Sequence, residues 1–409
     1  MDSEEALQLV KHGATLLFLD VPQFTLIGID TQMYSSGPNF KGIKMIPPGV
    51  HFVYYSSSNR EGNTFSPIIG FFIVVNPSEV IVRKWDKQEE RFVKFSEEDE
   101  ERYTEAVRRL EFDRQLGPYM LNQYEDWRHI SNYITKAVIE RIEPIGGEIT
   151  VSSEPESISN IPRTPMEKAL AEQLRSSTYT VPAEKSEQKG CYFTSIPRLI
   201  KHKGLSGHEL TSMNLDKTHV LETILAKEYG GNEDSLLGEL QFSFVAFLMG
   251  QSLEAYLQWK LITSLFLGCV EAPLHTSSRL FTKFVRVIYH QLKFGLQKDS
   301  KNADVSEEGA MALLEESWLS DDSFLHILCK EFFSLLLEAP VIDGDLLSWT
   351  RKLKDLLMNS IGWDFEQNSA ATELNFEDDE YAPVVEVIDD GGDDDVDHNG
   401  TPAGGMDTS

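Results

Sequence analysis

The chain has 409 residues, of which 41% are apolar, and a formal net charge of −29 at pH 7. This length predicts two or three domains with sizeable cores. The acidic balance argues against a protein that mainly binds nucleic-acid phosphates, because such binding depends on Lys and Arg. Two short basic clusters, at 198–203 and 351–354, are interpreted as solvated faces, so no direct nucleic-acid binding is expected.

The cysteines and the apolar stretches indicate a reducing compartment. Cys191, Cys269 and Cys329 are far apart and odd in number, which favours free thiols over a disulfide framework. The acidic residues at 2–5 are the opposite of a signal peptide's basic start. Polar residues interrupt the most apolar stretch, 242–270, which therefore predicts two packed helices and no membrane span. The nucleus or the cytoplasm is expected.

The first 150 residues predict a β-rich, largely antiparallel domain with a few helices. A short amphipathic helix is expected over 3–12. Runs of β-branched and aromatic residues bounded by turn residues follow at 15–19, 24–29, 50–55, 68–75, 79–83 and 91–94. Ser96 and Asp99 form a capping pair that opens a helix through Leu110, and a second helix holds Tyr124 to Ile134. The sheet region closes near Ile149.

Residues 151–190 are rich in Ser, Glu, Pro and Thr and are interpreted as a flexible linker. Possible phosphorylation sites within it are Ser152, Ser153, Ser157 and Thr164. Any linker of this composition contains such sites by chance, and that alternative stays open.

Residues 191–363 predict an all-helical domain. Apolar positions recur three and four residues apart, with capping residues before them. Ser206 with Glu209 forms a capping box, and helices are expected over 216–229, 234–249, 252–269, 277–294, 308–318, 322–338 and 345–361. Short connections between them favour a compact bundle or a solenoid-like stack.

The last 46 residues, 364–409, hold fifteen acidic side chains and no Lys or Arg, which predicts a disordered, solvated tail. Within it the apolar, β-branched run 381–388 favours an extended backbone that could add a strand to the edge of a partner's sheet. The candidate partner-binding residues are Tyr381, Pro383, Val384, Val385, Glu386, Val387 and Ile388. A chance apolar patch in a solubilising tail is the alternative.

Motifs for catalysis are missing from the sequence. There is no phosphate-binding loop, no G-x-G-x-x-G and no G-x-S-x-G elbow, and the ten histidines do not fall at metal-ligand spacing. Asp20 and Asp30 could be the paired carboxylates of a hydrolase, although Asp at a strand end is chiefly a turn former. We therefore expect no catalytic residue, cofactor or metal. The loops 37–42 and 46–51 are interpreted as recognition loops, or alternatively as hairpin connections with Phe40 in the core.

Several ordered blocks resemble the Aar-two family of splicing factors. The amino-terminal half carries Gly13-Ala-Thr-Leu-Leu-Phe-Leu-Asp-Val-Pro22, Gly28-Ile-Asp30, Phe40-Lys-Gly42, Ile46-Pro-Pro-Gly-Val-His-Phe-Val-Tyr54, Gly70-Phe-Phe, Leu116-Gly-Pro-Tyr119 and Trp127. The helical half carries Glu239-Leu-Gln-Phe-Ser-Phe-Val-Ala-Phe-Leu248 and Gln258-Trp-Lys260. The resemblance covers residues 1–363.

This resemblance implies a β-rich amino-terminal domain and a VHS-like helical domain in a protein that is not an enzyme. It implies an assembly chaperone of the U5 small nuclear ribonucleoprotein. Such a factor binds the ribonuclease H-like and MPN-type domains of the large U5 scaffold protein and holds off the RNA helicase until maturation. The tail strand 381–388 is where the family's intermolecular strand would lie, and a location in the nucleus and cytoplasm is expected.

Two further readings stay open. A VHS-like domain also suggests a trafficking adaptor, and a hydrolase is the third class. Added charge beside an interface can repel a partner, so phosphorylation in the linker is expected to trigger release.

Overall fold

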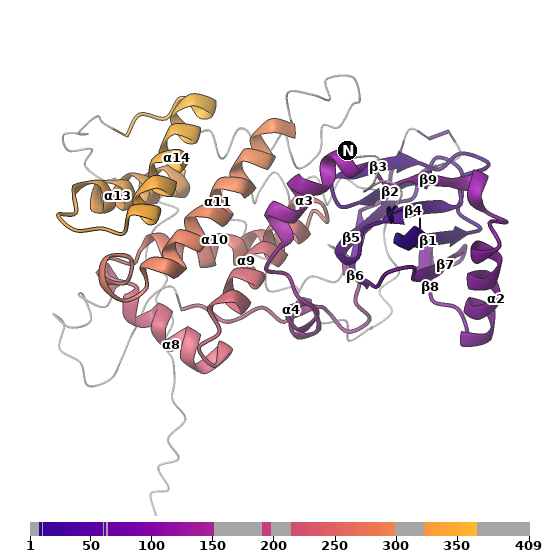
Figure 1. Ribbon diagram of the computed structural model, residues 1–409, viewed down its shortest axis with the longest axis horizontal. Helices are drawn as coiled ribbons and strands as arrows, with labels where there is room; N and C mark the ends of the chain where they lie inside the picture. Colours follow the sequence, from indigo (N-terminus) through magenta and orange to yellow (C-terminus); the bar gives the residue numbers. More distant parts are fainter. Residues whose placement is uncertain are drawn as a thin grey trace, which may run out of the picture.

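The computed structural model describes residues 8–9, 11–59, 61–62, 64–150, 190–197, 214–298 and 323–365. A β-rich part, formed by residues up to 150, lies at one end of the molecule and a helical part at the other (Figure 1). The two short helices α3 (Tyr124–Ser131) and α4 (Lys136–Ile142) lie between them. The β-rich amino-terminal part and the helical carboxy-terminal part confirm the predicted fold class.

The β-rich part contains two five-stranded sheets. The first has the order β8-β7-β1-β4-β9, with strands Arg91–Val93, Val80–Asp86, Ala14–Leu19, Gly42–Ile46 and Leu116–Pro118. The second has the order β10-β6-β5-β2-β3, with strands Ile149–Thr150, Ile69–Val75, Gly49–Ser56, Leu26–Ile29 and Gln32–Ser35. Among these strands, only β1–β7 and β4–β9 pair in parallel.

Side chains point alternately to the two faces of each sheet, and their contacts define the layers of the molecule. Leu17 and Leu19 of β1 pack toward α2 (Glu97–Arg108), whereas Leu16 and Phe18 pack between the sheets. On β5, Val53 and Tyr55 face the first sheet, and Phe52 and Tyr54 join the core of the helical part. The layers are therefore α2, first sheet, second sheet and helices.

In the helical part, several helices begin or end at capping residues that the sequence predicts. Its helices are α8 (Thr218–Tyr229), α9 (Glu233–Leu248), α10 (Leu253–Leu267), the π-helix η4 (Ala272–Thr276), α11 (Ser278–Lys298), α13 (Phe324–Glu338) and α14 (Gly344–Ile361). Ser252 caps α10, and Gly230 ends α8 with φ 58°, the left-handed conformation that favours glycine. Helix α9 is buried all round, because α3, α4, α8, α10 and α11 pack against it.

The structure corrects several expected element bounds. Asn232, and not Asp234, is the N-cap of α9. The helix expected over 124–134 ends at Ser131, and α4 starts afresh with Thr135 as its N-cap. Strands β3 and β4 and the 3-10 helices η1 (Asp113–Gln115) and η2 (Leu121–Gln123) were not predicted. Of the helix expected over 3–12, only the end is described, and the capping box at 206–209 and the helix at 308–318 lie outside the described residues.

Two general expectations can be compared with the described part of the chain. All three cysteines are free thiols, and Cys269 and Cys329 are buried. Within the described residues, no helix combines the length and the apolar character that crossing a membrane requires.

Candidate functional site

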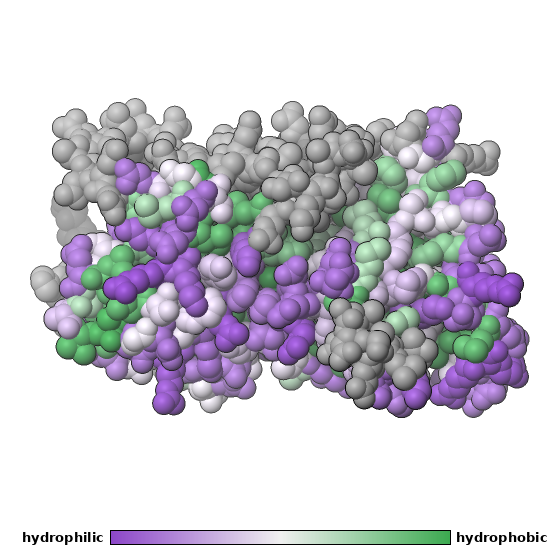
Figure 2. All heavy atoms as spheres, turned by 45° about the horizontal axis from the view of Figure 1, so that its top comes forward, coloured by the Kyte–Doolittle hydropathy of each residue, from purple (hydrophilic) through white to green (hydrophobic). Residues whose placement is uncertain are grey.

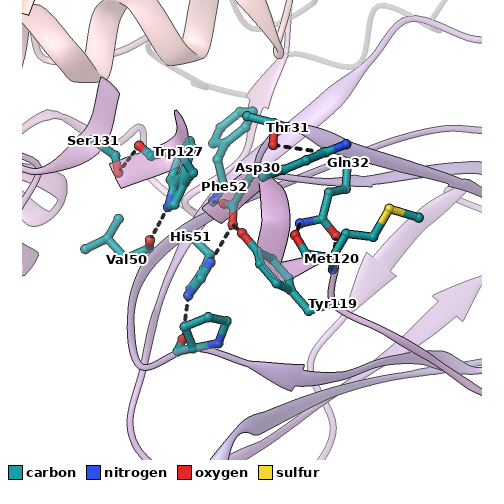
Figure 3. Close-up of polar contacts among 12 residues, drawn as sticks. Asp30, Thr31, Gln32, Val50, His51, Phe52, Tyr119, Met120, Trp127 and Ser131 are labelled. Carbon is teal, nitrogen blue, oxygen red and sulfur yellow. Dashed lines mark hydrogen bonds and ion pairs between the residues drawn. The ribbon is translucent and has the colours of Figure 1, made fainter. Parts of the chain in front are cut away.

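A buried polar network lies where strands β2 and β5 meet the loop before α3. Asp30 follows β2 with φ 54°, a left-handed turn that Asp tolerates, and its side chain is fully buried. Its Oδ1 accepts a hydrogen bond from the Phe52 backbone nitrogen at 2.9 Å, and its Oδ2 accepts from the Tyr119 hydroxyl at 2.6 Å. His51 Nδ1 lies 2.6 Å from the same Oδ2 (Figure 3). One carboxylate thus joins β2, β5 and the segment after β9.

The surroundings of His51 favour its protonated form. Its Nε2 lies 2.6 Å from the Pro47 carbonyl oxygen, which can only accept, so Nε2 must carry a proton. Its Nδ1 faces the Asp30 carboxyl group, whose negative charge favours a proton on Nδ1. Burial alone would lower the pKa of His51, but the charge and hydrogen bond of Asp30 and the bond to Pro47 outweigh it and raise the pKa. The side chains form a buried ion pair of imidazolium and carboxylate.

This network is built to hold structure and not to perform acid–base chemistry. Both side chains of the ion pair are fully buried, and both ring nitrogens of His51 are bonded, so no substrate atom could reach a free nitrogen. Burial, and then the charge of Asp30, raise the pKa of Tyr119, so its hydroxyl stays a donor. The hydrolase reading of Asp20 and Asp30 is not supported: Asp20 is an exposed turn residue with φ 60°, and Asp30 pairs with His51.

The network positions one of the two predicted recognition loops. His51 anchors the Pro47 carbonyl, and the Trp127 indole donates to the Val50 carbonyl at 2.9 Å, so the loop between β4 and β5 is tied to α3. In the other loop, Gly37 is exposed, whereas Phe40 is partly buried against the sheet core and stacks on Tyr34 at 6.0 Å. Phe40 therefore packs against the core, as the alternative interpretation of this loop as a hairpin connection expected.

A second buried network ties the segment 190–197 to the helices. Glu239 of α9 is fully buried and accepts bonds of 2.7 to 2.8 Å from the Thr194 backbone nitrogen and hydroxyl, the Tyr229 hydroxyl and the Gln258 amide. Arg141 of α4 donates to the Thr194 hydroxyl at 2.8 Å, with its guanidinium 4.1 Å from the centre of the Tyr229 ring. The Thr194 hydroxyl thus links Arg141 of the first part of the chain to the Glu239 carboxylate of the second.

Close packing completes the contact between the two parts. Phe72 of β6 stacks on Phe242 of α9, with ring centres 4.5 Å apart. Gln241 of α9 accepts from the Tyr133 backbone nitrogen at 2.7 Å, which satisfies a backbone donor in the short segment between α3 and α4. A Cβ atom at Gly238 would lie 2.6 Å from the Tyr133 carbonyl oxygen, so only glycine permits this approach.

The residues that the sequence nominated for partner binding cannot be placed. The tail strand residues Tyr381, Pro383, Val384, Val385, Glu386, Val387 and Ile388 lie outside the described residues, as do Ser152, Ser153, Ser157 and Thr164. Reasoning from the sequence missed the hydrogen-bond partners of Asp30 and Glu239. Those of Asp30 lie 21 to 89 residues away along the chain, and those of Glu239 lie 10 to 45 residues away. Among the described residues, no cluster of three or more His, Cys, Asp or Glu side chains could hold a metal ion.

The visible described surface is mostly hydrophilic, with apolar residues in several separate areas (Figure 2). Two exposed apolar side chains of the β-rich part are Phe24, just before β2, and Met33, within β3. Small separate apolar areas of this kind are normal for a protein surface and do not mark a large docking face.

Comparison with known proteins relates both parts to one family. The profile of the AAR2 N-terminal domain matches residues 12–144, and that of the AAR2 C-terminal repeat region matches residues 193–366. The Protein AAR2 homolog of Caenorhabditis elegans is 32% identical over 371 residues, covering 87% of this chain and 95% of the relative. The human Protein AAR2 homolog is 30% identical over 406 residues, covering 96% and 98%. The A1 cistron-splicing factor AAR2 of Saccharomyces cerevisiae is 23% identical over 287 residues, covering 68% and 76%.

Proposed function

This chain belongs to the AAR2 family, and we propose that it is a pre-mRNA splicing factor that acts by binding protein partners and not by catalysis. The observation that carries the proposal is the similarity to the family over nearly the whole length, including a yeast relative named as a splicing factor. The buried networks are consistent with it, because they hold loops and helices in place and offer no open acid or base.

The finer role that we propose is assembly of the U5 small nuclear ribonucleoprotein. The protein would bind the ribonuclease H-like and MPN-type domains of the large U5 scaffold protein and hold off the RNA helicase until maturation. Such a binder works best when its surface is rigid before contact, since less ordering entropy is lost on binding. The core shared by the β sheet and α9 supplies that rigidity.

We assign the main docking contact to the tail strand. In an extended segment, Val384 and Ile388 lie on one side and Val385 and Val387 on the other. Backbone hydrogen bonds would join the strand to a partner's sheet edge, and its side chains would enter pockets on both sides. The surrounding carboxylates would speed the approach to a basic surface.

The organisation that we propose has four segments: a β-rich domain at 1–150, a linker at 151–190, a VHS-like helical domain at 191–363 and an acidic tail at 364–409. The protein would act in the nucleus and pass through the cytoplasm with the U5 precursor. Phosphorylation at Ser152, Ser153, Ser157 or Thr164 would promote release of the partner by charge repulsion.

A pull-down from nuclear extract tests the docking contact. The truncated protein should end at Glu366, because Phe365 packs 5.0 Å from the Phe333 ring and removing it would disturb the helical part. Full-length protein should recover the U5 scaffold protein. The truncated protein should bind it at least about tenfold more weakly, which corresponds to a loss of about 1.4 kcal/mol or more of binding free energy.

A strand-breaking variant sharpens this test. Val385→Pro removes one backbone donor from the strand and should weaken recovery as strongly as truncation. The matched control neutralises Asp393, Asp394 and Asp395 to Asn, which should change the association rate and leave the bound complex intact. Equal recovery by the full-length protein and by Val385→Pro would refute the strand contact.

Two further experiments separate the remaining readings. A fluorescent fusion should be nuclear and cytoplasmic, whereas endosomal puncta would favour a trafficking adaptor. Phosphomimetic Glu substitutions at Ser152, Ser153, Ser157 and Thr164 should weaken scaffold binding, and unchanged binding would end the release hypothesis.

A further inference from the structure

A cavity of about 200 Å³ lies between α3 of the β-rich part and α11 of the helical part. Its α3 wall carries Arg128, His129 and Asn132, and its α11 wall carries Lys283, Arg286 and His290. The α11 residues are spaced by three, four and seven, and Asn132 lies three and four residues after His129 and Arg128, so each set lies on one side of its helix. Packing of α3 against α11 turns these two faces toward each other.

The cavity concentrates positive charge in a protein that is strongly acidic. Lys283 is already paired, with its Nζ 2.7 Å from Asp234 Oδ1. Within the described residues, Arg128 and Arg286 form no ion pair, and the Arg286 guanidinium lies 5.4 Å from the centre of the Trp349 ring. Two solvent-accessible guanidinium groups without a described counterion therefore border one cavity and are available to pair with an anion.

Further N–H donors lie beside these cations. The His129 and His290 rings stack with centres 4.0 Å apart and planes 4° apart. Burial, together with His129, Arg286 and Lys293, lowers the pKa of His290 to about 4. Asn132 gives its amide oxygen to Gln241 at 2.8 Å, so its amide nitrogen is the end that can donate elsewhere. The cavity thus offers donors of several kinds, and few acceptors.

The chemistry of these groups selects one ligand class. A phosphate monoester carries about −1.5 to −2 charges at pH 7 and three acceptor oxygens, which suits two guanidinium forks and neutral N–H donors better than a single carboxylate. The volume accommodates one such group. A nucleic-acid backbone would need an extended basic track, and the net charge of −29 disfavours it.

We propose that the α3–α11 cavity binds the phosphate monoester of a phosphoserine or phosphothreonine side chain. The ester could come from this chain or from a partner protein. The candidate sites Ser152 and Ser153 follow β10 directly in the sequence, which makes the chain's own linker one source. Glu125 also borders the cavity, and its carboxylate opposes the anion. The proposal does not depend on the tail contact proposed above.

Isothermal titration of the full-length protein tests the cavity with four ligands: inorganic phosphate, a peptide of residues 148–168 phosphorylated at Ser152 and Ser153, the same peptide without phosphate, and a phosphoserine peptide of unrelated sequence. A single-stranded oligonucleotide serves as competitor. Phosphate and the phosphopeptide should bind at one saturable site and the plain peptide should not. Arg128→Ala and Arg286→Ala should each weaken binding at least about tenfold, as expected for loss of a charge-assisted contact.

Three variants control the interpretation. Arg279→Ala removes an exposed cation of the same helix that does not border the cavity, and should leave affinity unchanged. Glu125→Gln should tighten binding, an effect that general damage to the fold cannot produce. Arg286→Lys keeps the charge and loses the fork, so it should fall between Arg286→Ala and the natural protein. Arg128 and Arg286 are exposed, and unchanged thermal melting will verify that the variants fold.

Three kinds of outcome would overturn the proposal. Absence of saturable phosphate binding, or equal weakening by Arg279→Ala, would overturn the site. Binding of inorganic phosphate without binding of the self-derived phosphopeptide or of a phosphoserine peptide of unrelated sequence would overturn the peptide assignment. Displacement of the phosphopeptide by a single-stranded oligonucleotide, with affinity rising with its length, would mark a nucleic-acid surface and also overturn it. A protein that ends at Glu366 should keep the site.

Discussion

Replacing Asp30 with Asn tests the buried ion pair with little change of shape. Asn tolerates the left-handed φ of 54° at this position and keeps one acceptor oxygen for the Phe52 backbone nitrogen. It removes the charge that faces His51 and places an N–H₂ group near two donors, the His51 Nδ1 and the Tyr119 hydroxyl. Breaking a buried ion pair in this way costs about 3–5 kcal/mol.

The cost should depend on pH in one direction. In the natural protein the raised pKa of His51 means that its protonated form stabilises the fold below the unfolded pKa of about 6.5, and this contribution is lost as pH rises through the folded pKa. In the Asp30→Asn protein, His51 can lose the Nδ1 proton and accept from the new amide. The natural protein then holds one more proton than the variant, so the difference in stability should shrink by about 1.4 kcal/mol per pH unit as pH rises.

Urea denaturation at pH 5.5, 6.5 and 7.5 measures this difference. Asp20→Asn is the matched control, because Asp20 has a φ of 60° and an exposed side chain, and it should cost no more than about 0.5 kcal/mol at each pH. A loss from Asp30→Asn that stays constant across the three pH values would refute the protonated state of His51. A loss under about 1 kcal/mol at pH 5.5 would refute the ion pair as a stabilising contact.

Three further predictions concern the packing and the buried carboxyl groups of α9 and α10. Glu239→Gln puts an amide among donors that all point at this position, and should cost about 3 kcal/mol in thermal or urea unfolding; a loss under about 0.5 kcal/mol would contradict the network. Gly238→Ala should cost about 1–3 kcal/mol because its Cβ meets the Tyr133 carbonyl oxygen at 2.6 Å, whereas Gly344→Ala, with open space around it, should be neutral or slightly stabilising. Burial raises the pKa of Glu254 to about 7, so the folded state holds a proton that the unfolded state has lost, and stability should fall between pH 4.5 and 7 by up to about 3 kcal/mol; Glu254→Gln should flatten that slope.

Local rules predicted most of the elements because their causes are local. The strands β1, β5 and β6 are runs of β-branched and aromatic residues, and their bounds agree with expectation within one residue. Ser96 and Ser252 cap helices where their side chains can reach a backbone nitrogen three residues on. Strand β3, with the mixed sequence Gln32–Ser35, carries little such signal and forms because β2 pairs with it.

Contacts across long sequence distances account for what was missed. The break after α3 depends on Gln241, which satisfies the Tyr133 backbone nitrogen from 108 residues away. The left-handed turn at Asp30 was foreseeable, but its pairing with His51 and Tyr119 depends on the register of β2 with β5 and on where β9 ends. A weak signal did exist for the α3–α11 cavity: α11 repeats cationic and imidazole residues at the spacing of one face, and α3 carries Arg128 beside His129. Only the packing of the two helices joins them.

The shared core also determines how the proposed docking contact must be measured. Phe52 and Phe72 of the second sheet and Phe242 of α9 belong to one cluster, so a substitution in either part can alter the whole body. A tail contact differs, because removal of residues after 366 leaves that cluster intact. If truncation lowers affinity for the scaffold protein while urea unfolding of the truncated body is unchanged, the tail contributes binding energy directly. If the unfolding midpoint falls as well, the loss of binding belongs to the body, and the strand assignment fails.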